Sequence, residues 1–125
     1  MKNQIKKKIL IIDDEPDMLE MLSQRLKFEN FEVTVASDGE EGLKISREFK
    51  PDVILLDVKM PGMDGWEVCR TLRADPTMAH IKIIMLTAIR SVKEAKLAGA
   101  DLVILKPCNM DELVEIVSNP NRREK

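Results

Sequence analysis

The chain has 125 residues, with 20 Lys and Arg against 22 Asp and Glu and a formal net charge of −2. This length suits one domain, and 44% hydrophobic residues can supply one ordinary core. The balanced charge argues against direct binding of nucleic acid, which usually needs a basic surface. Since no apolar run approaches the roughly 20 residues that cross a bilayer, we expect a cytoplasmic protein without membrane partners.

Apolar runs alternate with helical patterns along the whole chain. In order, the pattern predicts strand 9–12, a helix from Pro16, strand 31–35, a helix after Asp38, strand 53–56, a helix after Asp64, strand 83–86, helix 91–98, strand 102–105 and helix 111–118. Four of the strands are continuously apolar and are expected to be covered on both faces, whereas 31–35 alternates and reads as an edge strand. Five βα repeats predict an α/β fold with a parallel sheet between two helical layers.

Charged and polar side chains follow the four apolar strands. They are Asp13 and Asp14, Asp57, Thr87, and Lys106. Ligands of open α/β sheets bind at the carboxyl ends of the strands, so a doubly wound sheet brings these side chains together. Any one of them is explained as a loop starter or a helix cap, but this explanation fits the five together poorly.

Three carboxylates in one pocket imply a cation. At 4 Å and an effective dielectric constant of about 20, each like-charged pair costs roughly 4 kcal/mol before screening. Lys106 offsets part of this repulsion, and a divalent ion offsets the rest. Oxygen ligands with open coordination positions favour Mg²⁺, beside which a carboxylate can attack phosphorus and become an aspartyl phosphate. Asp57 is the best nucleophile, because it stands alone at the end of a central strand.

Six segments in order make the chain resemble the receiver domain of two-component response regulators. They are residues 9–15, 36–43, 51–57, 60–65, 83–88, and 99–101 with Lys106-Pro107. The resemblance covers residues 8–118, leaving a basic extension at 1–7 and a polar tail at 119–125. It implies a single flavodoxin-like (βα)5 domain with strand order 2-1-3-4-5.

The resemblance also implies roles for the strand-end residues. Asp57 would take a phosphoryl group from a histidine kinase or a histidine phosphotransfer protein. Mg²⁺ would be held by Asp14, Asp57 and the main-chain carbonyl of Lys59, with Asp13 acting through water. Thr87 and Lys106 would bind the phosphoryl oxygens, Thr87 would shift on activation, and the Lys106-Pro107 bond would be cis.

Three features depart from the family pattern. Val103 stands where the family usually has Tyr or Phe, so the aromatic half of the usual switch is missing. The interval from Thr87 to Gly99 is roughly one helical turn shorter than usual, which reduces the fourth helix. Lys59 and Ile89 occupy the places that flank the attacking water, and neither positions water well. We therefore expect slow self-dephosphorylation.

The leading hypothesis is a phosphoacceptor signalling module that switches a surface for an unknown downstream protein. It would not be an enzyme in the ordinary sense, although it would promote its own phosphorylation and dephosphorylation. The short tail after the last helix leads us to expect a stand-alone module. Alternatives are a receiver fragment of a larger regulator or hybrid kinase, a phosphate-independent binding module, and an aspartyl-phosphate hydrolase. Lys59 in place of a second acid argues against the hydrolase.

Overall fold

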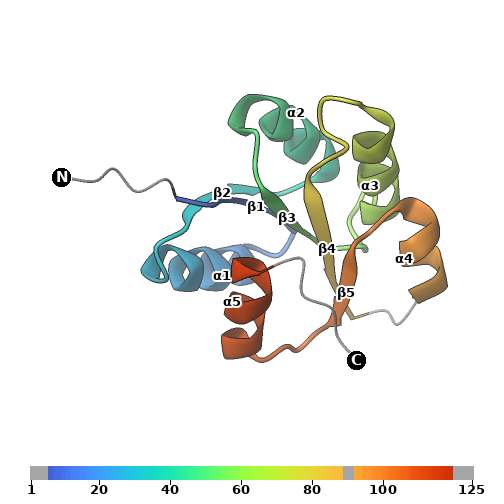
Figure 1. The fold of residues 1–125 in the computed structure, drawn as a ribbon. Coiled ribbons are helices and arrows are strands. Elements are labelled where there is room, and N and C mark those ends of the chain that lie inside the picture. The colour runs from blue at the N-terminus through green and yellow to red at the C-terminus, as the bar shows by residue number, and fades with distance from the viewer. Residues whose placement is uncertain (1–5, 89–91, 120–125) are drawn as a thin grey trace.

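The computed structural model describes residues 6–88 and 92–119, in which strands and helices alternate (Figure 1). The strands are β1 (Lys8–Ile12), β2 (Glu32–Ala36), β3 (Val53–Leu56), β4 (Lys82–Thr87) and β5 (Leu102–Leu105). The helices are α1 (Pro16–Phe28), α2 (Gly39–Phe49), α3 (Gly65–Ala74), α4 (Val92–Ala98) and α5 (Met110–Ser118). Most of the expected basic extension, Ile89, Ser91 and most of the polar tail lie outside the described residues.

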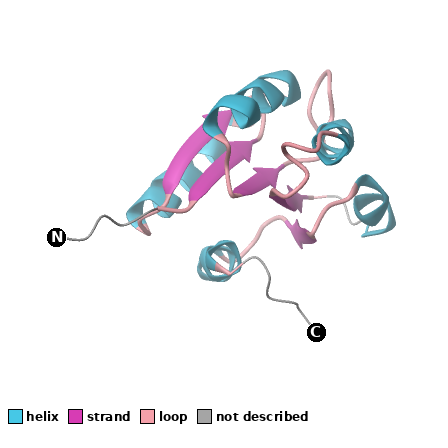
Figure 2. Cartoon of the chain, turned by 45° about the horizontal axis from the view of Figure 1, so that its top comes forward, coloured by secondary structure: helices cyan, strands magenta, loops and turns pink. Residues whose placement is uncertain are grey.

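The strands form one parallel sheet in the order β2-β1-β3-β4-β5, as predicted. Successive residues of a strand face opposite sides of the sheet. Each central strand therefore contributes side chains to two hydrophobic cores, one on each face of the sheet. On β1, Leu10 and Ile12 pack with α2 and α3, whereas Ile9 and Ile11 pack with α1 and α5. The sheet therefore lies between two helical layers (Figure 2), and β3, which precedes Asp57, is its central strand.

Side-chain caps fix where three helices start. Asp38 accepts a 2.8 Å hydrogen bond from the backbone N–H of Glu41 at the start of α2. Asp64 and Glu67 form a capping box at the start of α3. Asn109 accepts a bond from the N–H of Glu112, so α5 begins one residue earlier than its predicted start at 111. The starts of α2 and α3 after Asp38 and Asp64 agree with the prediction, whereas the cap that starts α5, Asn109, was not predicted.

β2 is an edge strand with an exposed face, as predicted, whereas β5 differs from expectation. β5 is only half-buried along its whole length, although its sequence is as apolar as the central strands. It lies at the edge of the sheet, so one side lacks a neighbouring strand. β2 runs one residue later than predicted, and Val35 is 39% exposed. A short apolar run specifies a strand but not whether that strand is central.

Candidate functional site

The structure brings the predicted strand-end residues to one edge of the sheet. A cavity of about 300 Å³ opens there, between the ends of β1, β3, β4 and β5. The residues that line it are Asp14, Glu15, Asp57, Lys59, Thr87, Ala88 and Lys106. Asp13 lies beside this cavity, in contact with Lys106. Five strand-end side chains and Lys59 thus share one site, as the parallel topology requires.

Three carboxylates lie close together at this cavity, two in its wall and Asp13 beside it. One oxygen atom from each of Asp13, Asp14 and Asp57 lies within 4.8 Å of the other two. Asp13 is 2% exposed and Asp57 is 7% exposed. Burial and the charge of Asp13 raise the pKa of Asp57 above its usual value, while Lys106 and a hydrogen bond from Val58 oppose the rise. The protein holds negative charges here that it does not itself fully neutralise.

Lys106 supplies the cation of the site. Its Nζ atom donates a 2.9 Å hydrogen bond to Asp13 Oδ2 and lies 3.5 Å from Glu15 and 3.6 Å from Asp57. Burial lowers the pKa of Lys106, but the hydrogen bond to Asp13 and the surrounding carboxylates outweigh it and raise the pKa overall. The ammonium therefore stays charged, and the following bond to Pro107 is cis.

The backbone holds the acidic loops in place. The N–H of Asp57 donates to the carbonyl of Ile12 at 2.9 Å, which ties the end of β3 to β1. The N–H of Gly65 donates to the carbonyl of Val58 at 2.8 Å, and a side chain at Gly65 would collide with the carbonyl oxygen of Asp57. A glycine at the start of α3 thus allows the helix to abut the loop that carries Asp57.

The donor set suits Mg²⁺. All three clustered side chains offer carboxylate oxygens, and hard oxygen ligands favour Mg²⁺ over softer metals. Asp13 is already engaged, since Oδ1 accepts the N–H of Glu15 at 2.9 Å and Oδ2 accepts Lys106. Asp14 and Asp57 both line the cavity and are better placed to face an ion. Lys59 lines the same cavity, two residues after Asp57 along the chain.

Two lining residues were not predicted as site residues. Glu15 places Oε1 3.5 Å from Lys106, and Ala88 lines the cavity after Thr87. Each directly follows a predicted site residue at the end of a strand. Their positions next to these residues in the sequence could therefore have indicated that they belong to the site. Glu15 adds a further negative charge at the rim, and the small side chain of Ala88 occupies little of the cavity.

Comparisons with known proteins agree with this geometry. The response regulator receiver domain family matches residues 9–118. The chain belongs to this family. MtrA, a DNA-binding response regulator of Mycolicibacterium smegmatis, is 41% identical over 122 residues, which are 95% of this chain and 52% of MtrA. The chemotaxis protein CheY4 of Vibrio cholerae superposes with a TM-score of 0.87 at 32% identity, covering 91% of this chain and 98% of CheY4.

The relatives correct one expectation. The near-neutral charge led us to expect no direct contact with nucleic acid, whereas MtrA and its mycobacterial counterparts are DNA-binding response regulators. The chain spans about half the length of these curated relatives. The composition of this chain says nothing about the other half of these relatives, so the expectation of no nucleic-acid contact was wrong.

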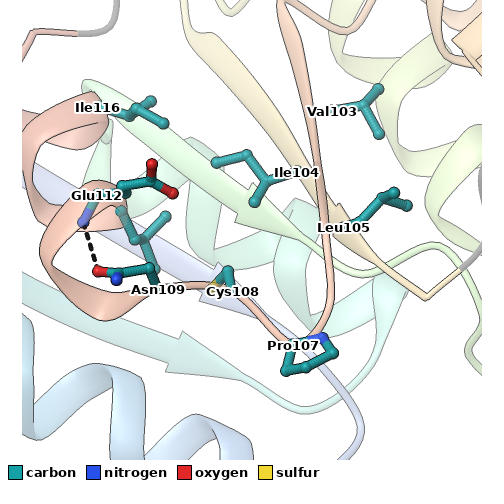
Figure 3. A pocket seen from close by; sticks show the side chains of 9 residues that line it. Val103, Ile104, Leu105, Pro107, Cys108, Asn109, Glu112 and Ile116 are labelled. Atoms are coloured by element: carbon teal, nitrogen blue, oxygen red, sulfur yellow. Dashed lines mark hydrogen bonds between the residues drawn. The ribbon is translucent and has the colours of Figure 1, made fainter.

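Two residues of this receiver domain bear on its expected switch. Thr87 is 1% exposed, and its carbonyl accepts the N–H of Lys106 at 2.8 Å, which joins the ends of β4 and β5. Val103 packs against the core formed with α2 and α3. It also lines a second cavity of about 300 Å³ between β5 and the start of α5. Figure 3 shows Val103 and Leu105 on one side of β5 and Ile104 directed toward α5.

Across the described residues 6–88 and 92–119, none of the helices is both long enough and apolar enough to span a membrane. The receiver domain is a signalling module of two-component systems rather than a typical enzyme.

Proposed function

We propose that this receiver domain is a Mg²⁺-dependent phosphoacceptor that uses Asp57. The observation that carries the proposal is the convergence of Asp57, a carboxylate cluster and Lys106 on one cavity of about 300 Å³. A side-chain nucleophile, a cation and a metal-compatible donor set are the parts that phosphoryl transfer to a carboxylate needs. The family membership supports a phosphohistidine of a histidine kinase or histidine phosphotransfer protein as the donor.

In the proposed reaction, a carboxylate oxygen of Asp57 forms a bond to phosphorus while the bond from phosphorus to the histidine nitrogen breaks. The histidine keeps the electron pair of the broken bond. Lys106, 3.6 Å from Asp57, then pairs with the phosphoryl oxygens, and the hydroxyl of Thr87 donates to them from the neighbouring strand. Mg²⁺, when bound, neutralises the carboxylates and the incoming phosphoryl charge.

The proposed metal ligands are Asp14, Asp57 and the main-chain carbonyl of Lys59, with Asp13 acting through water. The two hydrogen bonds that Asp13 already accepts, from Glu15 and Lys106, support this division. Asp13 would then orient Lys106 and act on the ion only through water. Asp14 and Asp57, both on the cavity wall, would be the residues that hold the ion directly.

The proposed output is a change in the surface around β4, α4 and β5 that alters binding of a downstream protein. Thr87 is joined to β5 through the bond from Lys106, so a shift of Thr87 displaces both strand ends. Val103 replaces the usual aromatic residue, so this switch relies on Thr87 and Lys106. The identity to MtrA favours a protein whose DNA binding is regulated by this domain. We place the reaction in the cytoplasm.

Phosphoryl loss is proposed to be slow. Lys59 lines the cavity where a hydrolytic water would approach Asp57, so its side chain would hinder that water, and its ammonium cannot accept a proton from it. Ile89, the other residue expected to flank the water, lies outside the described residues. The domain would promote its own phosphorylation and dephosphorylation without turning over a separate substrate.

Binding of fluoroberyllate, a stable mimic of the phosphoryl group, tests the assembled site. Fluorine NMR should show a bound signal only when Mg²⁺ is present, and Asp57→Asn and Asp14→Asn should abolish or strongly weaken it. Asp17→Asn, an equal charge change at an exposed residue of α1 outside the cavity, should bind as the native protein does. Equal binding by Asp57→Asn, or binding without Mg²⁺, would refute the proposed site.

A further inference from the structure

We propose that a third cavity, at the edge of the sheet opposite Asp57, binds a small organic anion. The cavity has a volume of about 380 Å³ and lies where α2 and α3 end and β4 begins. It is lined by Ser46, Arg47, Lys50, Asp75, Thr77, Met78, His80 and Ile81. The carboxylate site lies where the strands end, so the two cavities are separate.

The charged side chains of this cavity leave a surplus of positive charge. Arg47 lies in the last turn of α2 and Lys50 directly follows the helix, and both side chains line the cavity. Within residues 6–88 and 92–119, neither side chain makes an ion pair, and exposed His80 adds an imidazole from the other wall. Two full positive charges therefore face one carboxylate, that of Asp75.

The carboxylate of Asp75 is already occupied. Its Oδ1 atom accepts the backbone N–H of Thr77 at 2.9 Å and the hydroxyl of Thr77 at 2.7 Å. These bonds, together with the charge of Arg47, lower the pKa of Asp75. Asp75 thus stabilises its own loop through Thr77, while the side chains of Arg47 and Lys50 stay available to a ligand.

Lys50 adopts a backbone conformation that lysine rarely has. It follows α2 with φ 52° and ψ 64°, in the left-handed region where glycine is the usual residue after a helix. Asn30 has a similar φ of 74° after α1, but asparagine tolerates this region. Residues held in such strained positions cluster at functional sites, because a function of the side chain can outweigh the strain.

The opposite wall of the cavity is braced before any ligand binds. Met78 donates its N–H to the carbonyl of Asp75 at 2.9 Å, and Arg73 donates to the carbonyls of Ala79 and Ile81 at 2.8 and 2.7 Å. A preformed wall loses little conformational entropy on binding. Buried Met78 and Ile81 provide an apolar base beneath the cations. These features suit a phosphate or carboxylate group attached to a small apolar body.

The helix ends provide a competing explanation. The carboxyl ends of α2 and α3 both carry partial negative charge, and nearby cations stabilise such ends without any ligand. Lys50→Gly separates the two explanations, because it removes the cation and also relieves the strained backbone. If Lys50 serves a ligand, Lys50→Gly should raise the melting temperature and weaken anion binding.

Binding is tested by NMR titration of the isotopically labelled full chain with phenyl phosphate, in EDTA at constant ionic strength, with inorganic phosphate in a parallel arm. We expect saturable shifts confined to residues 46–50 and 75–81, and tighter binding of phenyl phosphate than of inorganic phosphate. Arg47→Gln and Lys50→Gln should each weaken binding at least about fivefold, roughly the loss of one charge-assisted hydrogen bond.

Lys44→Gln is the matched control, because Lys44 is an exposed lysine of the same helix that does not line the cavity. It should bind phenyl phosphate as the native protein does. The proposal is overturned by shifts that do not saturate, by an equal loss of binding in Lys44→Gln, or by a Lys50→Gly variant that binds normally. A lower melting temperature of Lys50→Gly would likewise support the role at the helix end and overturn the proposal.

Discussion

The ammonium group of Lys106 is hydrogen-bonded to Asp13, at 2.9 Å, and lies farther from Asp57, at 3.6 Å. The lysine after β5 thus reaches a carboxylate after β1, across the ends of β4 and β3. In the proposed reaction, a phosphoryl group on Asp57 competes with Asp13 for this cation. That competition gives phosphorylation a direct way to change the contacts of β5.

Removal of Lys106 should destabilise the protein. Lys106→Ala leaves the buried Asp13 and Asp57 without their cation, and uncompensated charges of this kind are costly. We expect a loss of about 2–3 kcal/mol in the free energy of unfolding, measured by urea denaturation in EDTA. Lys44→Ala, an exposed lysine, should change it by less than about 0.5 kcal/mol. An equal loss of stability in Lys106→Ala and Lys44→Ala would show that the contact of Lys106 with the carboxylates makes no specific contribution to stability.

Asp57→Asn should raise stability at neutral pH when metal is absent. The pKa of Asp57 is raised in the folded protein, mainly by burial and then by Asp13, so its ionised form is disfavoured there. Its contribution to stability is fully present below the ordinary pKa and is lost as the pH rises through the raised one. The difference in melting temperature between variant and native protein should therefore shrink as the pH falls from 7 toward about 4.

Adding Mg²⁺ should reverse this order, because the ion stabilises the native protein and has lost a ligand in the variant. An Asp57→Asn variant that is less stable than the native protein in EDTA would contradict the proposed repulsion.

Arg73 should hold α3, β4 and the end of α4 together. Its guanidinium group donates to the carbonyl of Gly99 at 2.7 Å and to Asp101 at 2.6 Å, in addition to two carbonyls of the loop before β4. Arg73→Ala leaves these acceptors unsatisfied and should cost about 2–4 kcal/mol of unfolding free energy. Arg70→Ala, on an exposed position of the same helix, should cost far less. Similar losses of unfolding free energy in Arg73→Ala and Arg70→Ala would refute the role of Arg73 in holding these elements together.

The lifetime of the phosphorylated state tests the role of Lys59. If its ammonium hinders the hydrolytic water, Lys59→Ala should accelerate phosphoryl loss, and Lys59→Arg should leave the rate close to that of the native protein. The rate is measured by following the intact mass after the phosphodonor is removed. An unchanged rate in Lys59→Ala would show that this side chain does not cover the phosphoryl group.

The strand ends explain why the acidic site was predictable from the sequence. Asp13, Asp57 and Lys106 each end a short apolar run, and a parallel sheet brings all such ends to one edge. The pairing of Lys106 with Asp13 rather than Asp57 was not predictable, because it depends on ångström differences in the positions of the loops. The contribution of Glu15 likewise depends on how its side chain turns toward Lys106.

The less buried parts of the fold were harder to predict. The β5 sequence is as apolar as that of β3, yet only β3 is fully buried, since burial depends on strand order rather than on local composition. The cavity beside Lys50 joins two helix ends that are distant in the sequence. The DNA-binding relatives were not predictable either, because the composition of this chain describes only the receiver domain.

Intact mass after incubation with acetyl phosphate and Mg²⁺ tests the central claim most directly. We predict a single phosphoryl adduct on the native protein, none in EDTA and none on Asp57→Asn, while Asp17→Asn is modified as the native protein is. An adduct of equal yield on Asp57→Asn, or no adduct on a native protein that is folded and supplied with Mg²⁺, would contradict the assignment of Asp57 as the phosphoacceptor.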